Sequence, residues 1–88
     1  MQSKNKKDPT AAEKRHIERV KALPCSVCGV SGPSDCHEPQ QGLWYASIAL
    51  CRDCHMGSNN GWHGRKAIWR VMKMDELDAL AKTIERLQ

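Results

Sequence analysis

The sequence predicts a small α+β domain in which a metal-stabilised β-hairpin lies between an N-terminal helix and C-terminal helices. Two observations behind this prediction are the length of only 88 residues and the absence of Phe. So short a chain buries little apolar surface and needs support beyond a hydrophobic core. The third observation is that four of the five cysteines form two Cys-x-x-Cys pairs. We expect residues 1–8 to be a flexible basic tail and residues 9–88 to form one zinc-stabilised domain.

The first expected element is a helix over residues 9–22. Asp8 is placed to accept hydrogen bonds from the first-turn amides, and Pro9 is favourable at the first helical position. Pro24 ends the helical pattern. The narrow apolar side that would face the rest of the domain consists of Ile17, Val20 and Leu23.

A hairpin is expected between the two cysteine pairs. The first pair, Cys25 and Cys28, is followed by Gly29, which can adopt the left-handed conformation that directs backbone amides at cysteine sulfurs. Residues 35–38 and 43–50 are the expected strands, and a short loop containing Pro and Gly joins them. The sequence therefore places extended structure between two cysteine-bearing turns.

Helices are expected after the second cysteine pair. A short helix begins near Cys54, a further helix covers residues 64–72, and Asp75 is placed to cap a last helix that ends near Leu87. The apolar stripe of the last helix suits the core or a partner contact. We expect this stripe to be part of the core, because so small a chain has few other apolar residues to form one. The side chains expected to face inward are Ile68, Trp69 and Met72, and then Leu77, Leu80, Ala81, Ile84 and Leu87.

The two cysteine pairs predict a structural zinc site. Cys25, Cys28, Cys51 and Cys54 provide four thiolates, and the two-residue spacers let both members of each pair face one tetrahedral ion. Two redox-active dithiols are the weaker alternative, and iron also suits a site of four sulfurs. Cys36 is left over, either as a small buried side chain, which we favour, or as an additional ligand.

Composition narrows the compartment and the partner. The N-terminal residues are polar and basic with no apolar stretch behind them, so we expect no signal peptide and a reducing, cytoplasmic environment. We also expect a soluble protein, because no apolar run approaches the length of a membrane span. The 14 Lys and Arg against 10 Asp and Glu give a formal charge of +4. This balance permits a nucleic-acid partner and equally suits an ordinary solvated surface.

Three of the four histidines lie around the cysteine pairs, where the zinc site does not need them. His37 is in the first expected strand, His55 follows Cys54 directly, and His63 follows a Gly- and Asn-rich loop. That loop must fold back if the last two histidines share an ion. Imidazole titrates near neutral pH and binds divalent metals, so it suits both a general base and a metal site. His16, on the charged first helix, is expected to face solvent.

The combined motifs resemble those of the zinc-containing HNH endonucleases. The elements that carry the resemblance are Cys25-x-x-Cys28-Gly29, a lone His37, Leu50-Cys51-x-x-Cys54-His55 and His63-Gly64. The likeness covers residues 24–80 and is closest to small phage and prophage members, such as the phage recombination-enhancement nucleases. It implies a protein that works in the cytoplasm of a bacterial host.

The resemblance implies a treble-clef-like ββα-metal fold that hydrolyses DNA phosphodiester bonds with one catalytic ion. His37 would act as the general base. His55 and His63 would hold a divalent cation such as Mg²⁺ or Mn²⁺ against the phosphate and the 3′ leaving oxygen. So short a nuclease can depend on a partner protein for targeting or act as a dimer. The nearby basic residues that suit phosphate contacts are Arg52, Arg65, Lys66 and Arg70.

Two positions depart from the family pattern. Family members often carry Asp or His just before the base, where this chain has Cys36. They also carry a central Asn or similar residue that orients the base, for which Ser47 is the nearest substitute. Asp35 projects to the same strand face as His37, so it is a candidate metal ligand or a candidate orienting partner for the base.

Three hypotheses follow, and each makes a different structural demand. The nuclease, our first hypothesis, requires His37, His55 and His63 to converge at a point outside the zinc site. The alternative is a non-catalytic zinc module that binds nucleic acid, which needs only a basic face and predicts salt-sensitive binding without turnover. The third is a protein-interaction module, which predicts an exposed apolar stripe on the last helix.

Overall fold

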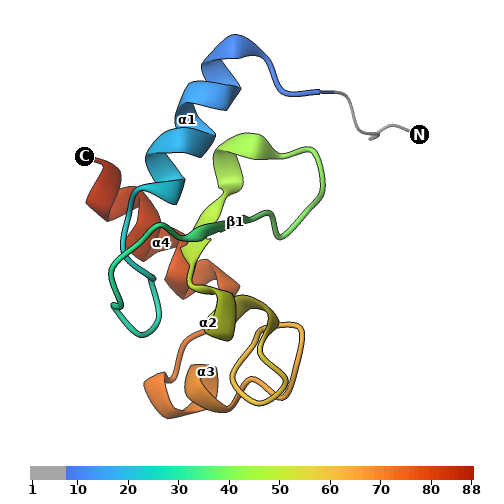
Figure 1. The fold of residues 1–88 in the computed structure, drawn as a ribbon, viewed down its shortest axis with the longest axis vertical. Helices are drawn as coiled ribbons and strands as arrows, with labels where there is room; N and C mark the ends of the chain where they lie inside the picture. The colour runs from blue at the N-terminus through green and yellow to red at the C-terminus, as the bar shows by residue number, and fades with distance from the viewer. Residues whose placement is uncertain (1–7) are drawn as a thin grey trace.

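The computed structural model describes residues 8–88, so the expected basic tail lies outside the described residues except for Asp8. The elements in chain order are α1 (Ala11–Lys21), β1 (Asp35–His37), the 3-10 turn η1 (Trp44–Ala46), β2 (Ile48–Leu50), α2 (Arg52–Met56), α3 (Ala67–Met72) and α4 (Glu76–Leu87). The hairpin of β1 and β2 lies at the centre, with α1 above it, α4 packed across it and α2 and α3 below (Figure 1).

Helix α1 begins later than predicted, because Thr10 rather than Asp8 caps it. The Thr10 hydroxyl accepts a hydrogen bond from the Glu13 amide at 3.1 Å, and the Glu13 carboxylate accepts one from the Thr10 amide at 2.8 Å. This capping box satisfies the first-turn amides that Asp8 was expected to serve, so the predicted Asp8 cap is wrong. The helix buries Val20 against the rest of the domain.

His16 on α1 does not face solvent as predicted. Its ring lies against Tyr45, with the two ring centroids 5.0 Å apart. Its Nε2 atom is buried and has no hydrogen-bond partner among residues 8–88. His16 therefore contributes to the packing of α1 on η1 rather than to the charged surface of the helix.

The hairpin is shorter than predicted. Strands β1 and β2 pair antiparallel over three residues each, with His37 opposite Ile48. Residues 44–46 were expected in the second strand but form η1. The physical reason is that the Ser47 hydroxyl donates a hydrogen bond to the Trp44 carbonyl at 2.5 Å and closes a tight turn. The predicted second strand is therefore correct only at β2.

Buried polar contacts fix helix α4 to the hairpin. The Thr83 hydroxyl accepts a hydrogen bond from the Ala49 amide at 3.2 Å and shares another of 2.7 Å with the Ser26 hydroxyl. Asp75 caps the helix as predicted, through a capping box with Asp78. Because Thr83 is completely buried at this contact, it determines which face of α4 meets the sheet.

The face of α4 that meets the core differs from the predicted apolar stripe. Ala79 and Thr83 are fully buried, whereas Leu77 is 73% exposed and Ile84 is 43% exposed. The hydrogen bonds of Thr83 turn this face of small residues toward β2, and the larger apolar residues are rotated away. The remaining members of the predicted stripe are the half-buried Leu80 and Leu87 and the exposed Ala81.

Helix α3 begins at Ala67, later than predicted, because a series of turns precedes it. Trp69 is buried as predicted, and its indole Nε1 donates a hydrogen bond to the Cys54 carbonyl at 3.0 Å. Ile68 packs against the core, but Met72 is 48% exposed and does not face inward as predicted. Trp69 therefore connects α3 directly to a cysteine-bearing segment.

The predicted fold class is confirmed at the level of a small α+β domain with a two-stranded antiparallel sheet and flanking helices. The hydrophobic core of the domain contains two of the cysteines in addition to apolar side chains. Within residues 8–88, no helix has both the length and the apolar character needed to cross a membrane. The main members of the core are Val27, Ile48, Leu50, Trp69, Ala79, Cys25 and Cys54.

Candidate metal centres

The first candidate centre is formed by the four cysteines of the two Cys-x-x-Cys pairs. One sulfur atom from each of Cys25, Cys28, Cys51 and Cys54 lies within 4.8 Å of all the others. Across the two pairs, Cys28 Sγ and Cys51 Sγ lie 3.8 Å apart. Four thiolates at this spacing are positioned to bind a tetrahedral metal ion such as zinc, as the sequence predicted.

Backbone amides point at the sulfur atoms of this cluster. The amides of Val27 and Cys28 donate to Cys25 Sγ at 3.4 and 3.5 Å, and the Cys54 amide donates to Cys51 Sγ at 3.4 Å. Gly29 follows the first pair with φ +80°, the left-handed conformation predicted for it. Hydrogen bonds of this kind favour the charged form of the sulfur, so the backbone fits a bound metal ion.

The cysteines do not ionise equally. Burial raises the pKa of Cys25, but hydrogen bonds from the backbone of Cys28, Cys51 and Val27 outweigh it and bring the pKa to about 7. Burial and the neighbouring Cys25 raise the pKa of Cys54 far above its usual range. All four thiols can ionise together only with a cation among them, so this donor set fits a bound metal ion.

Cys36 lies outside both candidate centres. Its side chain is half-buried on the face of β1 opposite His37, and burial raises the pKa of its thiol. The structure therefore places Cys36 away from the four-sulfur cluster, as favoured from the sequence, but half-buried rather than fully buried.

The second candidate centre is formed by three histidines from three different segments. His37 lies on β1, His55 on α2 and His63 in the loop before α3. One ring nitrogen from each lies within 4.8 Å of the other two, and the ring centroids are 5.0 to 5.2 Å apart. None of the three belongs to the cysteine cluster, so they form a separate set of candidate nitrogen ligands.

A tight loop brings His63 beside His55. The Trp62 amide donates to the Cys54 carbonyl at 2.9 Å, and the His63 amide donates to the His55 carbonyl at 3.2 Å. Gly61 lets the chain pass close to itself, because a Cβ atom there would lie 2.5 Å from a backbone carbonyl oxygen. The loop therefore folds back, as a shared ion requires.

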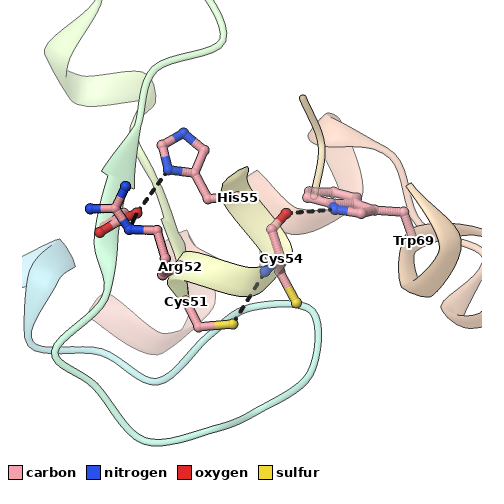
Figure 2. A network of polar contacts seen from close by, with 6 residues as sticks. Cys51, Arg52, Cys54, His55 and Trp69 are labelled. Atoms are coloured by element: carbon pink, nitrogen blue, oxygen red, sulfur yellow. Dashed lines mark hydrogen bonds and ion pairs between the residues drawn. The ribbon is translucent and has the colours of Figure 1, made fainter. Parts of the chain in front are cut away.

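Helix α2 carries residues of both centres. Figure 2 shows the sulfur atoms of Cys51 and Cys54 on one side of this short helix and the ring of His55 on the other. The Cys54 carbonyl also receives the indole hydrogen bond of Trp69. Any metal that orders the cysteine cluster therefore also fixes the direction of His55.

Two carboxylates hold the histidine rings in place. Asp35 Oδ2 lies 2.9 Å from His55 Nδ1, and Glu76 Oε2 lies 2.7 Å from His37 Nε2. Asp35 was a candidate partner for His37, but the structure places it on His55 instead. Metal-binding histidines usually have their second ring nitrogen engaged in this way, so the His55 contact fits a metal site.

Sequence reasoning missed Glu76. It lies 39 positions after His37 and reaches it only because α4 packs across the hairpin. The one local signal was its place directly after Asp75, in the first turn of a capped helix, which says nothing about a distant strand. Its contact with His37 is a product of tertiary structure.

The electrostatics of the histidine cluster favour a neutral His63. Desolvation lowers the pKa of His63, and positive charge on His37 or His55 lowers it further. Neutral imidazole is the form that binds metal. The His63 ring is therefore available as a ligand at neutral pH.

Basic side chains lie on the segments that carry His55 and His63. Arg52 is 78% exposed and its Nε lies 3.5 Å from Asp35 Oδ2 (Figure 2). Lys66 Nζ lies 4.1 Å from the centroid of the Trp62 ring, in the loop that carries His63. The Arg70 guanidinium donates to the Arg65 carbonyl, which joins α3 to the same loop. All four basic residues singled out from the sequence therefore lie on α2, on α3 or in the loop between them.

An open groove lies beside His55 and has a volume of about 660 Å³. Lys21 and Arg52 contribute positive charge to its lining, and Asp35 and His55 form the part nearest the histidine cluster. A groove of this composition can accept a negatively charged chain next to the candidate metal ligands.

Comparison with known proteins gives no relative for this chain. No family model, no curated protein and no solved structure matches it.

Proposed function

We propose that the chain is a metal-dependent DNA endonuclease of the HNH type, with a treble-clef-like ββα-metal site. The observation that carries the proposal is the convergence of His37, His55 and His63 at a point separate from the four cysteines. A structural zinc site alone does not need these imidazoles, and a simple binding module has no reason to gather them. A nuclease needs both a base and metal ligands at one point.

In this proposal His55 and His63 are the metal ligands. Asp35 engages His55 Nδ1, so Nε2 is the nitrogen left to bind an ion. A divalent cation such as Mg²⁺ or Mn²⁺ bound there would supply positive charge to the phosphate and to the leaving oxygen. Zinc at the cysteine cluster would have a purely structural role, because four protein ligands leave no open position.

His37 is the proposed general base. It takes a proton from water as the water oxygen forms a bond to phosphorus and the bond from phosphorus to O3′ breaks. The leaving O3′ receives a proton from solvent, and the products are a 5′-phosphate and a 3′-hydroxyl. Burial of His37 to 6% exposure holds the ring in one orientation for this step.

DNA is the proposed substrate because of the basic residues around the cluster. Arg52 lines the groove beside His55, and Arg65, Lys66 and Arg70 lie around the loop of His63. Side chains of this type position nucleic acid through its phosphates. They would place one phosphodiester against the histidines and the neighbouring phosphates along the basic residues.

A protein contact is the second candidate role, and one observation favours it. Leu77 and Ile84 are exposed on α4, and Ile84 lines an apolar groove with Leu43 and Tyr45. The interaction hypothesis required an exposed apolar surface on this helix. Such a surface also suits a small nuclease that is targeted by a partner protein, so the two roles are compatible.

The test is a plasmid-nicking assay on the zinc-loaded protein with added Mg²⁺ or Mn²⁺. We expect the wild type to convert supercoiled DNA to open circles, EDTA to stop the reaction and His37→Ala to abolish it. His16→Ala is the matched control, because His16 lies on α1 outside both clusters, and it should retain activity. Full activity in His37→Ala would contradict the assignment of the base. No nicking by a folded, zinc-loaded wild type in either metal would contradict the nuclease.

A further inference from the structure

Glu76 is the only carboxylate that contacts the buried side chain of His37 in the described part of the chain. It occupies the first residue of α4, and its side chain is 27% exposed. Its Oε2 atom lies 2.7 Å from His37 Nε2, the distance of a strong hydrogen bond to a charged acceptor. No feature of the sequence assigned a role to this residue.

The carboxylate of Glu76 is not needed to cap its own helix. Asp75 and Asp78 form the capping box at this end of α4, and each accepts a backbone amide of the other. Within residues 8–88, His37 is also the sole ion-pair partner of Glu76. The specific contact of the Glu76 side chain is therefore the one with His37.

We propose that Glu76 is the positioning residue of the base, and that it holds His37 as the tautomer with a proton on Nε2. This inference rests on the proposed nuclease function. An ionised carboxylate can only accept hydrogen bonds, so the ring nitrogen that faces it must carry a proton. In a neutral imidazole the other nitrogen, Nδ1, then has the free lone pair. Glu76 thereby selects Nδ1 as the atom that accepts the proton of the attacking water.

The rest of α4 keeps Glu76 in reach of His37. Thr83 lies two turns further along the helix and is hydrogen-bonded to Ala49 on β2. Since His37 lies on the paired strand β1, both ends of the contact are fixed to the same hairpin. The arrangement fills the role of the orienting residue that the sequence lacks at the position of Ser47.

The two carboxylates of the site consequently have different tasks. Asp35 engages Nδ1 of His55 and leaves Nε2 to a metal ion, whereas Glu76 engages Nε2 of His37 and leaves Nδ1 to a proton. The two carboxylates therefore leave a different ring nitrogen free on each histidine. A carboxylate that fixes the tautomer of a catalytic histidine is a known device in hydrolases, and its loss lowers kcat more than KM.

The experiment compares wild type, Glu76→Ala, Glu76→Gln and the control Asp78→Ala, all zinc-loaded and full-length. The first readout is the ¹⁵N spectrum of the histidine rings at pH 8, where the tautomer of each neutral ring is visible. We expect His37 in the wild type to be protonated on Nε2 alone, and Glu76→Ala to give a mixture of tautomers. Asp78→Ala removes the capping box, so it should weaken the fold without changing the His37 tautomer.

The second readout is the nicking reaction. We expect Glu76→Ala to lower kcat by about 10²-fold, with KM nearly unchanged, because the orientation of a general base is lost. Glu76→Gln keeps the shape of the side chain and should lie between wild type and Glu76→Ala. If Glu76→Ala proves unstable, Glu76→Gln decides the question. A wild-type His37 protonated on Nδ1, or an unchanged kcat in both Glu76 variants, would overturn the proposal.

The two readouts separate this inference from the proposed function. If the wild type does not nick DNA, the nuclease proposal fails, whatever the histidine spectrum shows. If the wild type nicks DNA but the spectrum shows no effect of Glu76 on His37, the nuclease stands and the role of Glu76 is wrong.

Discussion

The cysteine cluster and the histidine cluster share helix α2 but differ in almost every physical respect. The cysteine cluster has four sulfur ligands, joins the core through Cys25 and Cys54, and is supported by backbone amides. The histidine cluster has three candidate nitrogen ligands, and side-chain carboxylates contact two of them. A closed set of four ligands suits a structural ion, whereas three imidazoles with basic neighbours leave room for a substrate.

The difference shows how one short helix can carry residues of two sites. Cys54 and His55 are adjacent in the sequence, yet α2 directs their side chains to opposite sides (Figure 2). The ion that stabilises the fold would therefore also hold the second cluster in shape. We expect the two clusters to respond differently to a lost ligand, to pH and to a lost basic neighbour, in decreasing order of effect.

The largest effect is expected from removing a sulfur ligand. Cys51→Ser should abolish zinc binding and unfold the domain, because binding energy at such sites, about 10–16 kcal/mol, is also folding energy. Circular dichroism with zinc quantification checks this outcome. Cys36→Ser is the control, since Cys36 lies outside the cluster, and it should keep both zinc and fold. A well-folded Cys51→Ser protein would mean that the cysteines do not form one structural site.

A fall in pH should have a smaller effect. It should weaken metal binding at the histidine cluster and leave zinc bound at the cysteine cluster. The pKa of His63 is lowered, so its ring is in the neutral, metal-binding form at pH 7. As the pH falls through the ordinary imidazole pKa of about 6.5, protons compete for the rings and metal affinity drops. Mn²⁺ binding should weaken about tenfold per pH unit for each proton displaced, while zinc at the cysteines is retained at pH 6.

The lowered pKa of His63 also makes the stability of the fold depend on pH. Because the folded-state pKa of His63 is lowered, the folded chain binds fewer protons than the unfolded chain. His63 therefore makes the free energy of unfolding rise with pH across the imidazole range, and it destabilises the fold increasingly as the pH falls below the ordinary imidazole pKa. The predicted fall in metal affinity is checked by calorimetric titration of the protein with Mn²⁺ between pH 7.5 and pH 5.5. Equal affinity at both ends would contradict a histidine-bound ion.

The smallest effect is expected from a single basic residue beside the histidines. Lys66→Gln should weaken DNA binding about equally for all sequences and reduce the slope of log K against log salt by about one, because one phosphate contact is lost. Lys14→Gln on the exposed side of α1 is the matched control and should leave the slope unchanged. Identical slopes for the two variants would show that Lys66 does not meet the DNA.

The sequence could predict those features that depend on neighbouring residues. The spacing of Cys25 with Cys28, the left-handed Gly29 and the Asp75 cap are local, and each is present in the structure. The α+β class followed from them, because two cysteine turns with a hairpin between them leave few other arrangements for so short a chain.

The features that sequence reasoning missed depend on contacts between distant residues. The burial of Thr83 turned α4 so that Leu77 and Ile84 face outward, although their spacing suggested a core stripe. Ser47 closed a tight turn where a strand was expected. Glu76 reaches His37 across the packed helix, and no local pattern marks that contact.

The central claim is that this chain has two separate metal centres of different chemistry, and a Co²⁺ titration of the metal-free, full-length protein tests it most directly. We predict that the first equivalent gives intense thiolate-to-cobalt absorption, and that a second equivalent binds without further sulfur bands. In a variant with both His55→Ala and His63→Ala, only the first equivalent should bind. Saturation of the wild type at one equivalent, with sulfur bands alone, would contradict the account.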